Sequence, residues 1–164
     1  MKPNEEVVVP PLQYGIVVNH LPAGTAYAAK ELLDLGKVKM FTLEYVDSTK
    51  YGTKDMIKVD NIEDEGLDSL VDKLKETEEK LSLISPDITL YVIRDGKIEK
   101  RYHPQLPDIV EGTVSCKNRK CVTNSEPDTV AEFRVHNNGE ISLKCAYCEE
   151  ELSRKDILDA LVNS

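Results

Sequence analysis

The sequence predicts an α+β protein of two parts, a ferredoxin-like antiparallel sandwich followed by a small, zinc-ribbon-like β domain. Three observations predict it. Segments with strand and helix patterns come in the order β-α-β-β-α-β, with one extra hairpin strand. A proline-punctuated stretch follows, and then four cysteines in two close pairs. We therefore expect an N-terminal domain over residues 1–102, a linker over 103–112 and a C-terminal domain over 113–164.

The N-terminal part begins with an apolar arm, residues 7–12, whose two prolines exclude a central strand. A helix is predicted over residues 23–35, because apolar residues recur there at helical spacing and Gly36 follows as a stop. Residues 64–83 carry a leucine stripe and predict a second helix. Asp95-Gly96 lies between two β runs and predicts a hairpin. The predicted strands are residues 15–19, 40–46, 54–59, 88–93 and 97–101.

For the C-terminal part, the sequence predicts one hairpin and one helix. Residues 131–135 and 140–144 are expected strands, joined through the turn signal Asn137-Asn138-Gly139. Ser153 is expected to cap a last helix over residues 154–162.

Composition excludes several classes of function. The net charge of −9 argues against a nucleic-acid partner, whose phosphates require a basic face. No apolar run reaches the roughly 20 residues of a membrane span, and the N-terminus lacks the layout of a signal peptide. We expect a cytoplasmic protein with no membrane partner. Because the cytoplasm is reducing, it favours metal over disulfides for paired cysteines.

The four cysteines, Cys116, Cys121, Cys145 and Cys148, have the spacing of a tetrahedral zinc site. Four thiolates leave no position open for water, so we expect one structural Zn²⁺ per chain rather than a catalytic ion. Two disulfides, unrelated buried thiols and a four-thiolate iron centre are the alternatives. A zinc complex of four thiolates carries a formal charge of −2, which four neighbouring cations are expected to offset: Lys117, Arg119, Lys120 and Lys144.

Four blocks of the sequence together resemble the regulatory chain of aspartate carbamoyltransferase. They are Gly15–Ala23 (GIVVNHLPA), Gly52–Asn61 (GTKDMIKVDN), Pro104–Pro107 (PQLP) and the cysteine quartet. The resemblance covers nearly the whole chain. It implies a non-catalytic subunit in pyrimidine biosynthesis, with an N-terminal domain that binds ATP, CTP or UTP as allosteric effectors. It also implies pairing with a second regulatory chain and docking of the zinc domain on catalytic trimers, six chains of each kind forming the holoenzyme.

The resemblance also implies an effector site. Lys58 and His20 match family positions that meet the nucleotide, and Arg101 falls where a lysine is usual. Strand periodicity places Lys54 on the same face as Lys58, whereas Asp55 is expected to be a surface residue. The complete expected set of effector-binding residues is Val9, Leu12, Asn19, His20, Lys58, Ile93, Ile98 and Arg101.

Several positions depart from the family pattern near the base and ribose. Asn19 stands in place of an aspartate, Tyr91 in place of an asparagine and Gly96 in place of a tyrosine, and Pro10 and Pro11 alter the arm. These departures keep a second hypothesis open, a structural clamp of the same holoenzyme with a degenerate effector site. A stand-alone zinc-ribbon adaptor, of a different class, is the third.

Overall fold

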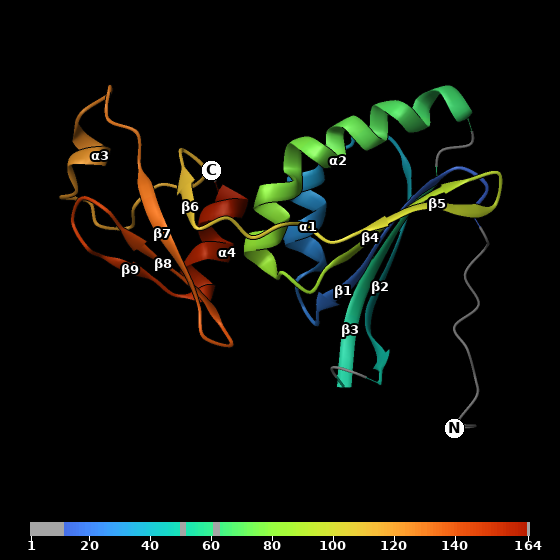
Figure 1. Ribbon diagram of the computed structural model, residues 1–164, viewed down its shortest axis with the longest axis horizontal. Helices are drawn as coiled ribbons and strands as arrows, with labels where there is room; N and C mark the ends of the chain where they lie inside the picture. Colours follow the sequence, from blue (N-terminus) through green and yellow to red (C-terminus); the bar gives the residue numbers. More distant parts are fainter. Residues whose placement is uncertain (1–11, 50–51, 61–62, 164) are drawn as a thin grey trace.

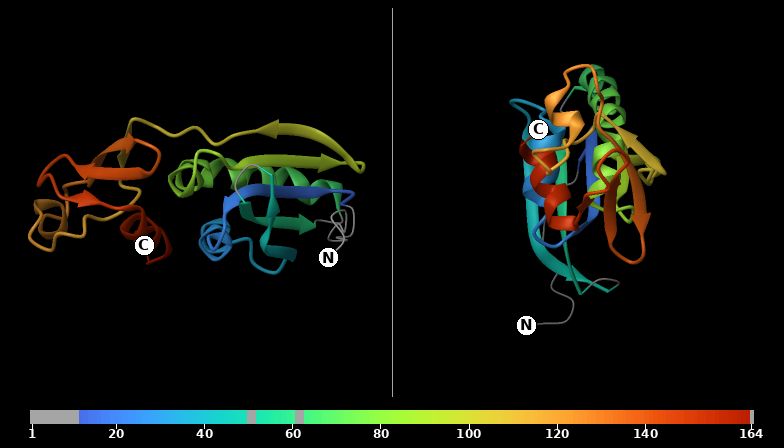
Figure 2. Two further views of the ribbon diagram at one scale, coloured as in Figure 1. Left: turned by 90° about the horizontal axis from the view of Figure 1, so that it is seen from below. Right: turned by 90° about the vertical axis from the view of Figure 1, so that its left-hand side faces the viewer.

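The computed structural model describes residues 12–49, 52–60 and 63–163. These residues form two lobes joined by a single extended segment (Figures 1 and 2). The first lobe contains β1 (Gly15–Pro22), α1 (Ala26–Leu33), β2 (Lys39–Ser48), β3 (Gly52–Asp60), α2 (Asp64–Ile84), β4 (Thr89–Arg94) and β5 (Lys97–Tyr102). The second contains β6 (Ile109–Glu111), α3 (Val122–Ser125), β7 (Glu132–Asn137), β8 (Ile141–Cys145), β9 (Glu151–Leu152) and α4 (Arg154–Asn163).

The first lobe is the predicted ferredoxin-like sandwich. Its five strands are ordered β2-β3-β1-β4-β5, and every neighbouring pair is antiparallel. Both helices cover the same face of this sheet (Figure 1). The hairpin between β4 and β5 turns at Asp95 and Gly96, which both have positive φ, as the Asp-Gly signal predicts.

Strand alternation decides which side chains pack under the helices. In β3, Asp55, Ile57 and Val59 are buried, whereas the residues between them are only partly covered. Ile16 and Val18 of β1 pair with Val59 and Ile57, so they lie on the same buried face. The stripe predicted on α2 packs against this face through Leu67, Leu70, Leu74 and Leu81, all buried.

Asp55 lies inside the protein, so the prediction of a surface residue is wrong. Its Oδ2 accepts hydrogen bonds from the backbone N–H groups of Gly24 (2.9 Å) and Ala26 (3.0 Å). Its Oδ1 accepts another from the N–H of Tyr45 (2.9 Å). Thr25, the N-cap residue of α1, makes no side-chain cap, so a carboxylate from a distant strand satisfies the start of the helix instead.

A β-bulge interrupts β1 next to the predicted effector residues. Val18 pairs with Ile57 and Leu21 pairs with Asp55, so Asn19 and His20 stand together opposite one residue of β3. His20 has a φ of 59°, in the left-handed region. The N–H of His20 donates to Oδ1 of Asn19 (2.7 Å), which stabilises this local turn of the backbone.

The second lobe is a four-stranded antiparallel sheet, ordered β6-β7-β8-β9, with α4 against it. Its first strand, β6, falls within the segment expected to be linker, and β9 and α3 were not predicted. These elements have four residues or fewer, too short to show a period. The hairpin of β7 and β8 and the Ser153-capped helix match the predictions.

Helix α4 joins the two lobes. It lies between its own sheet and the helices α1 and α2, which it contacts (Figure 1). Ile157 and Leu161, buried and one helical turn apart, form its apolar stripe. The hydroxyl of Thr113 also donates to Oε1 of Glu79 on α2 (2.9 Å). No helix within the described residues is long and apolar enough to cross a membrane.

Tyr102 yields a prediction about stability. Its hydroxyl is buried without a hydrogen-bond partner among the described residues, and burial, with Glu78 nearby, raises its pKa to about 12. Tyr102→Phe should therefore leave stability unchanged or raise it by about 1 kcal/mol at neutral pH. The unfolded phenol ionises near pH 10, so the wild type should lose stability between pH 10 and 12, and the variant should lack this loss. Urea unfolding at several pH values measures both effects, and a loss above 1 kcal/mol at neutral pH would reveal a bonded hydroxyl.

Candidate metal centre and ligand-binding face

The four cysteines converge at the end of the second lobe. Cys116 precedes a tight loop that ends at Cys121, Cys145 ends β8, and Cys148 lies in the turn toward β9. Their Sγ atoms all lie within 4.8 Å of one another. Cys116, Cys121 and Cys145 are buried, Cys148 is half-buried, and all four are free thiols, which excludes the two-disulfide alternative in this structure.

The donor set fits a tetrahedral metal ion. Cys116 Sγ lies 3.6 Å from Cys148 Sγ, and Cys121 Sγ lies 3.8 Å from Cys145 Sγ. Four sulfurs about 2.3 Å from a central Zn²⁺ would stand about 3.8 Å apart. Each of these sulfur contacts joins a cysteine of the first pair in the sequence, Cys116 and Cys121, to one of the second pair, Cys145 and Cys148. Folding must therefore bring both loops together before a metal ion can be enclosed.

Backbone amides direct their N–H groups at the sulfurs. Burial raises the pKa of the Cys116 thiol to about 12, although the N–H of Asn118 acts in the opposite sense. For Cys148, burial is outweighed by the N–H of Glu150, the Asn118 side chain and neighbouring thiols, which lower its pKa to about 7. A metal ion must therefore displace a proton from Cys116 at neutral pH, so metal affinity should rise with pH.

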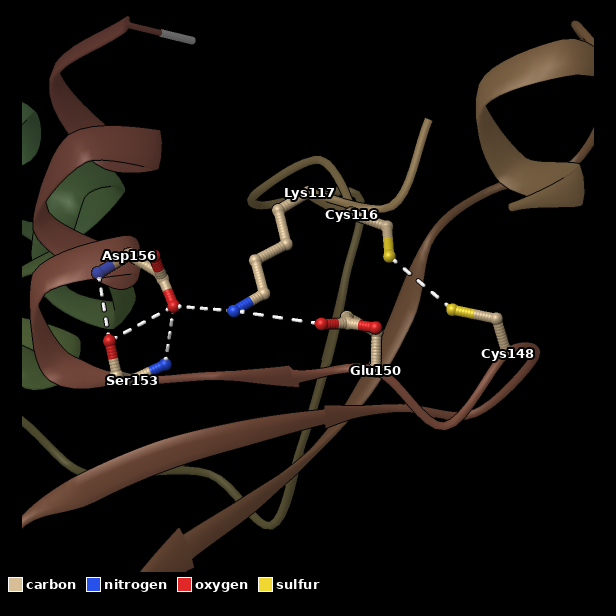
Figure 3. A network of polar contacts seen from close by, with 6 residues as sticks. All are labelled: Cys116, Lys117, Cys148, Glu150, Ser153 and Asp156. Atoms are coloured by element: carbon tan, nitrogen blue, oxygen red, sulfur yellow. Dashed lines mark hydrogen bonds and ion pairs between the residues drawn. The ribbon is translucent and has the colours of Figure 1, made fainter. Parts of the chain in front are cut away.

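Lys117 bridges three segments around the thiols (Figure 3). Its Nζ donates to Oδ2 of Asp156 in the first turn of α4 (2.9 Å) and pairs with Oε1 of Glu150 (3.6 Å). The same Oδ2 accepts hydrogen bonds from the N–H and the hydroxyl of Ser153, each at 2.9 Å. Lys117 hydrogen bonding holds the pKa of Asp156 at about 2. Lys117 therefore faces two carboxylates, so its charge is not simply available to offset thiolates as the sequence suggested.

The open face of the first sheet collects predicted effector residues from four strands. Strand register aligns Lys58 of β3 with Val17 of β1, Val17 with Tyr91 of β4, and Tyr91 with Arg101 of β5. We call this cross-strand set, Lys58, Val17, Tyr91 and Arg101, the cationic row. Neighbouring strands lie about 4.8 Å apart, so the backbones of Lys58 and Arg101, the two cations of the row, stand roughly 14 Å apart.

The other predicted residues lie around this row. Ile93 pairs with Ile98 on the same face, and Ile98 is 61% exposed. Asn19 pairs with Thr89, and His20 Nδ1 lies 2.9 Å from Oγ1 of that threonine. Leu12 is buried just before β1, whereas Val9 lies outside the described residues.

Arg101 already has an aromatic neighbour. Its guanidinium Cζ lies 5.4 Å from the ring centroid of Tyr91, and Nη2 lies 3.4 Å from the tyrosine hydroxyl. A stacked guanidinium retains donors at its edge for phosphate oxygens. Lys54, also half-buried on this face, has its pKa lowered by desolvation.

His20 also faces the second lobe. It borders a cleft of about 650 Å³ between the lobes, lined in addition by Ile84 at the end of α2, by Pro86 after it, and by Ile141 and Arg154 of the second lobe. The open face with the predicted effector residues and the interlobe cleft therefore share a residue, His20.

Comparison with known proteins identifies the family. The family model described as "Aspartate carbamoyltransferase regulatory chain, allosteric domain" matches residues 7–105, and the one described as its "metal binding domain" matches residues 108–158. The chain belongs to the aspartate carbamoyltransferase regulatory chain family. It is 36% identical over 154 residues to the regulatory chain of Methanocaldococcus jannaschii, covering 93% of this chain and 97% of that one. It is 34% identical over 142 residues to the regulatory chain of Bifidobacterium longum, covering 85% and 94% of the two chains.

Membership of the regulatory chain family confirms that this is a non-catalytic subunit, since these relatives are named regulatory chains. It also removes the hypothesis of an unrelated zinc-ribbon adaptor. The metal-binding domain of the family coincides with the four converging cysteines.

The sequence analysis named Lys117 only as a charge that offsets the thiolates, and it missed the contacts of Lys117 with Glu150 and Asp156. Lys117 meets Glu150 and Asp156 only in the folded chain, because both acidic residues lie more than 30 positions further along the sequence. The pattern Ser153-x-x-Asp156 was a readable signal for part of this network. An acidic residue three positions after an N-cap serine predicts a reciprocal capping box, which the structure contains.

Proposed function

We propose that this regulatory chain binds nucleoside triphosphates on the open face of its first lobe, holds one structural Zn²⁺ and docks on aspartate carbamoyltransferase catalytic trimers. An effector would act by population shift, changing how the second lobe sits on the trimers and so biasing a two-state equilibrium of the holoenzyme. Residues 1–102 form the effector domain and residues 113–164 the zinc domain of this proposal, with residues 103–112 between them. The complex would act in the cytoplasm.

Zinc is the proposed metal because the site is closed and made only of sulfur. Cys116, Cys121, Cys145 and Cys148 would hold it, and their sulfur spacings agree with tetrahedral Zn²⁺. The ion would supply folding free energy to the second lobe and would perform no chemistry on a substrate. Metal analysis after purification with zinc and iron present would distinguish the two ions.

The alignment of cations from separate strands is the observation that carries the nucleotide proposal. Lys58 and Arg101 end the cationic row, with the apolar Val17 and the ring of Tyr91 between them. Cations suit the phosphates of an effector, and an aromatic or aliphatic surface suits its base. Asn19 and His20 at the bulge, with Ile93 and Ile98 on the other side, complete the proposed site; Leu12 and Val9 belong to it through the arm.

Calorimetry of the full chain with ATP, CTP and UTP tests this site. Lys58→Ala should weaken binding of the preferred nucleotide by about tenfold, the effect of removing one charge-assisted contact. Lys100→Ala is the matched control, because Lys100 is exposed on β5 and pairs with Val92, a residue of the opposite, helix-covered face. Equal losses in both variants would indicate general electrostatics rather than a site on the open face.

A second candidate function is a structural clamp without an effector switch. Two observations favour it: Arg101 is stacked on Tyr91, and Oδ1 of Asn19 already accepts the N–H of His20. Titration of the assembled holoenzyme discriminates the two functions. A shift of aspartate saturation with any of the three nucleotides supports the regulator, and unchanged saturation with all three supports the clamp.

Pairing with a second regulatory chain is proposed through β2. This ten-residue strand ends the first sheet, with only β3 beside it among the described residues. A terminal strand offers backbone donors and acceptors to a strand of another chain. Two copies related by a two-fold axis would place β2 against β2 and continue the sheet across the interface.

A further inference from the structure

We propose that Lys117 is a positioning residue for the metal site, acting through Asp156 to hold the Cys116 loop against the first turn of α4. This inference rests on the metal site of the proposed function. It concerns three side chains that neither the family description nor the cysteine pattern assigns: Lys117, Glu150 and Asp156.

The position of Lys117 makes it a link between both cysteine pairs. It follows Cys116 directly, and its partner Glu150 comes two residues after Cys148. Cys116 and Cys148 are themselves in sulfur contact at 3.6 Å (Figure 3). The ammonium group therefore spans the two loops on the side of the site where their thiols meet. Separation of these loops would have to break both the metal–sulfur bonds and this ionic contact.

Asp156 connects the loops to a rigid element. One oxygen, Oδ2, accepts from Lys117 Nζ, Ser153 N and Ser153 Oγ, all at 2.9 Å. The carboxylate is thus fixed by the helix cap before it meets the lysine, so little entropy is lost on pairing. The next residue, Ile157, is fully buried, and Leu161 follows it one helical turn later in the stripe of the helix that contacts α1 and α2. Movement of the Cys116 loop would therefore be resisted by the packed helix.

Other cations near the thiols lack this arrangement. Arg119 and Lys120 are exposed on the same loop, and no ion pair to either is present among the described residues. Lys120 uses its backbone N–H, which donates to Asn118 Oδ1 at 3.0 Å. Substitution of the Lys120 side chain is therefore a matched control with the same change of charge.

Transfer of Zn²⁺ from the full-length chain to a chromophoric chelator measures the effect. Lys117→Met should release the ion about fivefold faster than the wild type, and Lys120→Met should stay within twofold. Lys117→Arg should restore most of the slow release, because its guanidinium reaches the same carboxylates. Asp156→Asn should accelerate release to a similar extent. The double variant Lys117→Met with Asp156→Asn should be no faster than Lys117→Met alone, because Lys117→Met already removes the contact of this lysine with Asp156.

Amide hydrogen exchange separates positioning from general loss of stability. Lys117→Met should speed exchange at residues 117–121 and in the first turn of α4 while leaving the β7–β8 hairpin unchanged. Acceleration across the whole second lobe would overturn the proposal, and so would equal release from the Lys117→Met and Lys120→Met variants. If Lys117→Met does not fold, the release rate of Asp156→Asn decides. Absence of bound metal in the wild type would instead reject the proposed zinc site.

Discussion

Cys145→Ser is expected to abolish the fold of the second lobe while the first lobe remains folded. Cys145 is fully buried, and its backbone carbonyl and N–H also hold the turn that carries Cys148. Structural zinc contributes about 10–16 kcal/mol in comparable small modules, more than a sheet with strands of six residues or fewer can replace. Removal of the ion with a chelator should have the same effect, and addition of Zn²⁺ should reverse it.

Amide–proton NMR of the full chain is the measurement for this result. The amide signals of β7 and β8, including those of Phe133 and Leu143, should move to the chemical shifts of an unfolded chain. The amide signals of Ile16 and Val18 should keep their chemical shifts. Ser125→Ala, an exposed change near the thiols, is the control that keeps all four ligands. A folded second lobe in the metal-free Cys145→Ser variant would contradict the proposed structural metal. Binding to the catalytic trimer should disappear together with the fold of this lobe.

Asp55→Ala is expected to cost the first lobe about 3 kcal/mol of unfolding free energy. The change leaves three backbone N–H groups without their acceptor, two of them where α1 begins. A buried donor without a partner costs about 1–3 kcal/mol, and the lost negative charge also removes a favourable contact with the helix dipole. Asp55→Asn, which retains one acceptor oxygen, should lose about half as much.

Urea unfolding of the isolated chain measures the Asp55 effect. Asp47→Asn on β2 is the control, because Asp47 is exposed and its replacement should change stability by less than about 0.5 kcal/mol. A midpoint for Asp55→Ala within error of the Asp47→Asn midpoint would show that water replaces the carboxylate at the start of α1.

The regular elements were predictable because each has a period long enough to read. The stripe on α2, the alternation in β3 and the Asp95-Gly96 turn each determined local structure without help from distant residues. The cysteine spacing likewise indicated that four sulfurs would meet. The spacing could not indicate that each sulfur contact joins one cysteine of the first pair to one of the second. That arrangement depends on how β8 returns beside the loop between Cys116 and Cys121.

The misinterpretation of Asp55 has a specific cause. The alternation of β3 puts Asp55 on the same face as Ile57 and Val59, so the pattern itself predicted burial. Its polarity suggested the surface because no partner was visible nearby in the sequence. The partners are backbone N–H groups around Thr25 and at Tyr45, which only the tertiary fold brings within reach. The pairing of Lys117 with Asp156 was not predicted for the same reason.

The two edge strands of the first sheet, β2 and β5, differ in a way that limits how copies of this protein can aggregate. β5 presents charged, exposed side chains along its length, whereas β2 has fewer charges and several partly covered residues. Charged borders discourage edge-to-edge addition. In the proposed pairing through β2, one receptive edge strand and one charged edge strand would give closed pairs, which would not extend into a fibril by repeated strand addition.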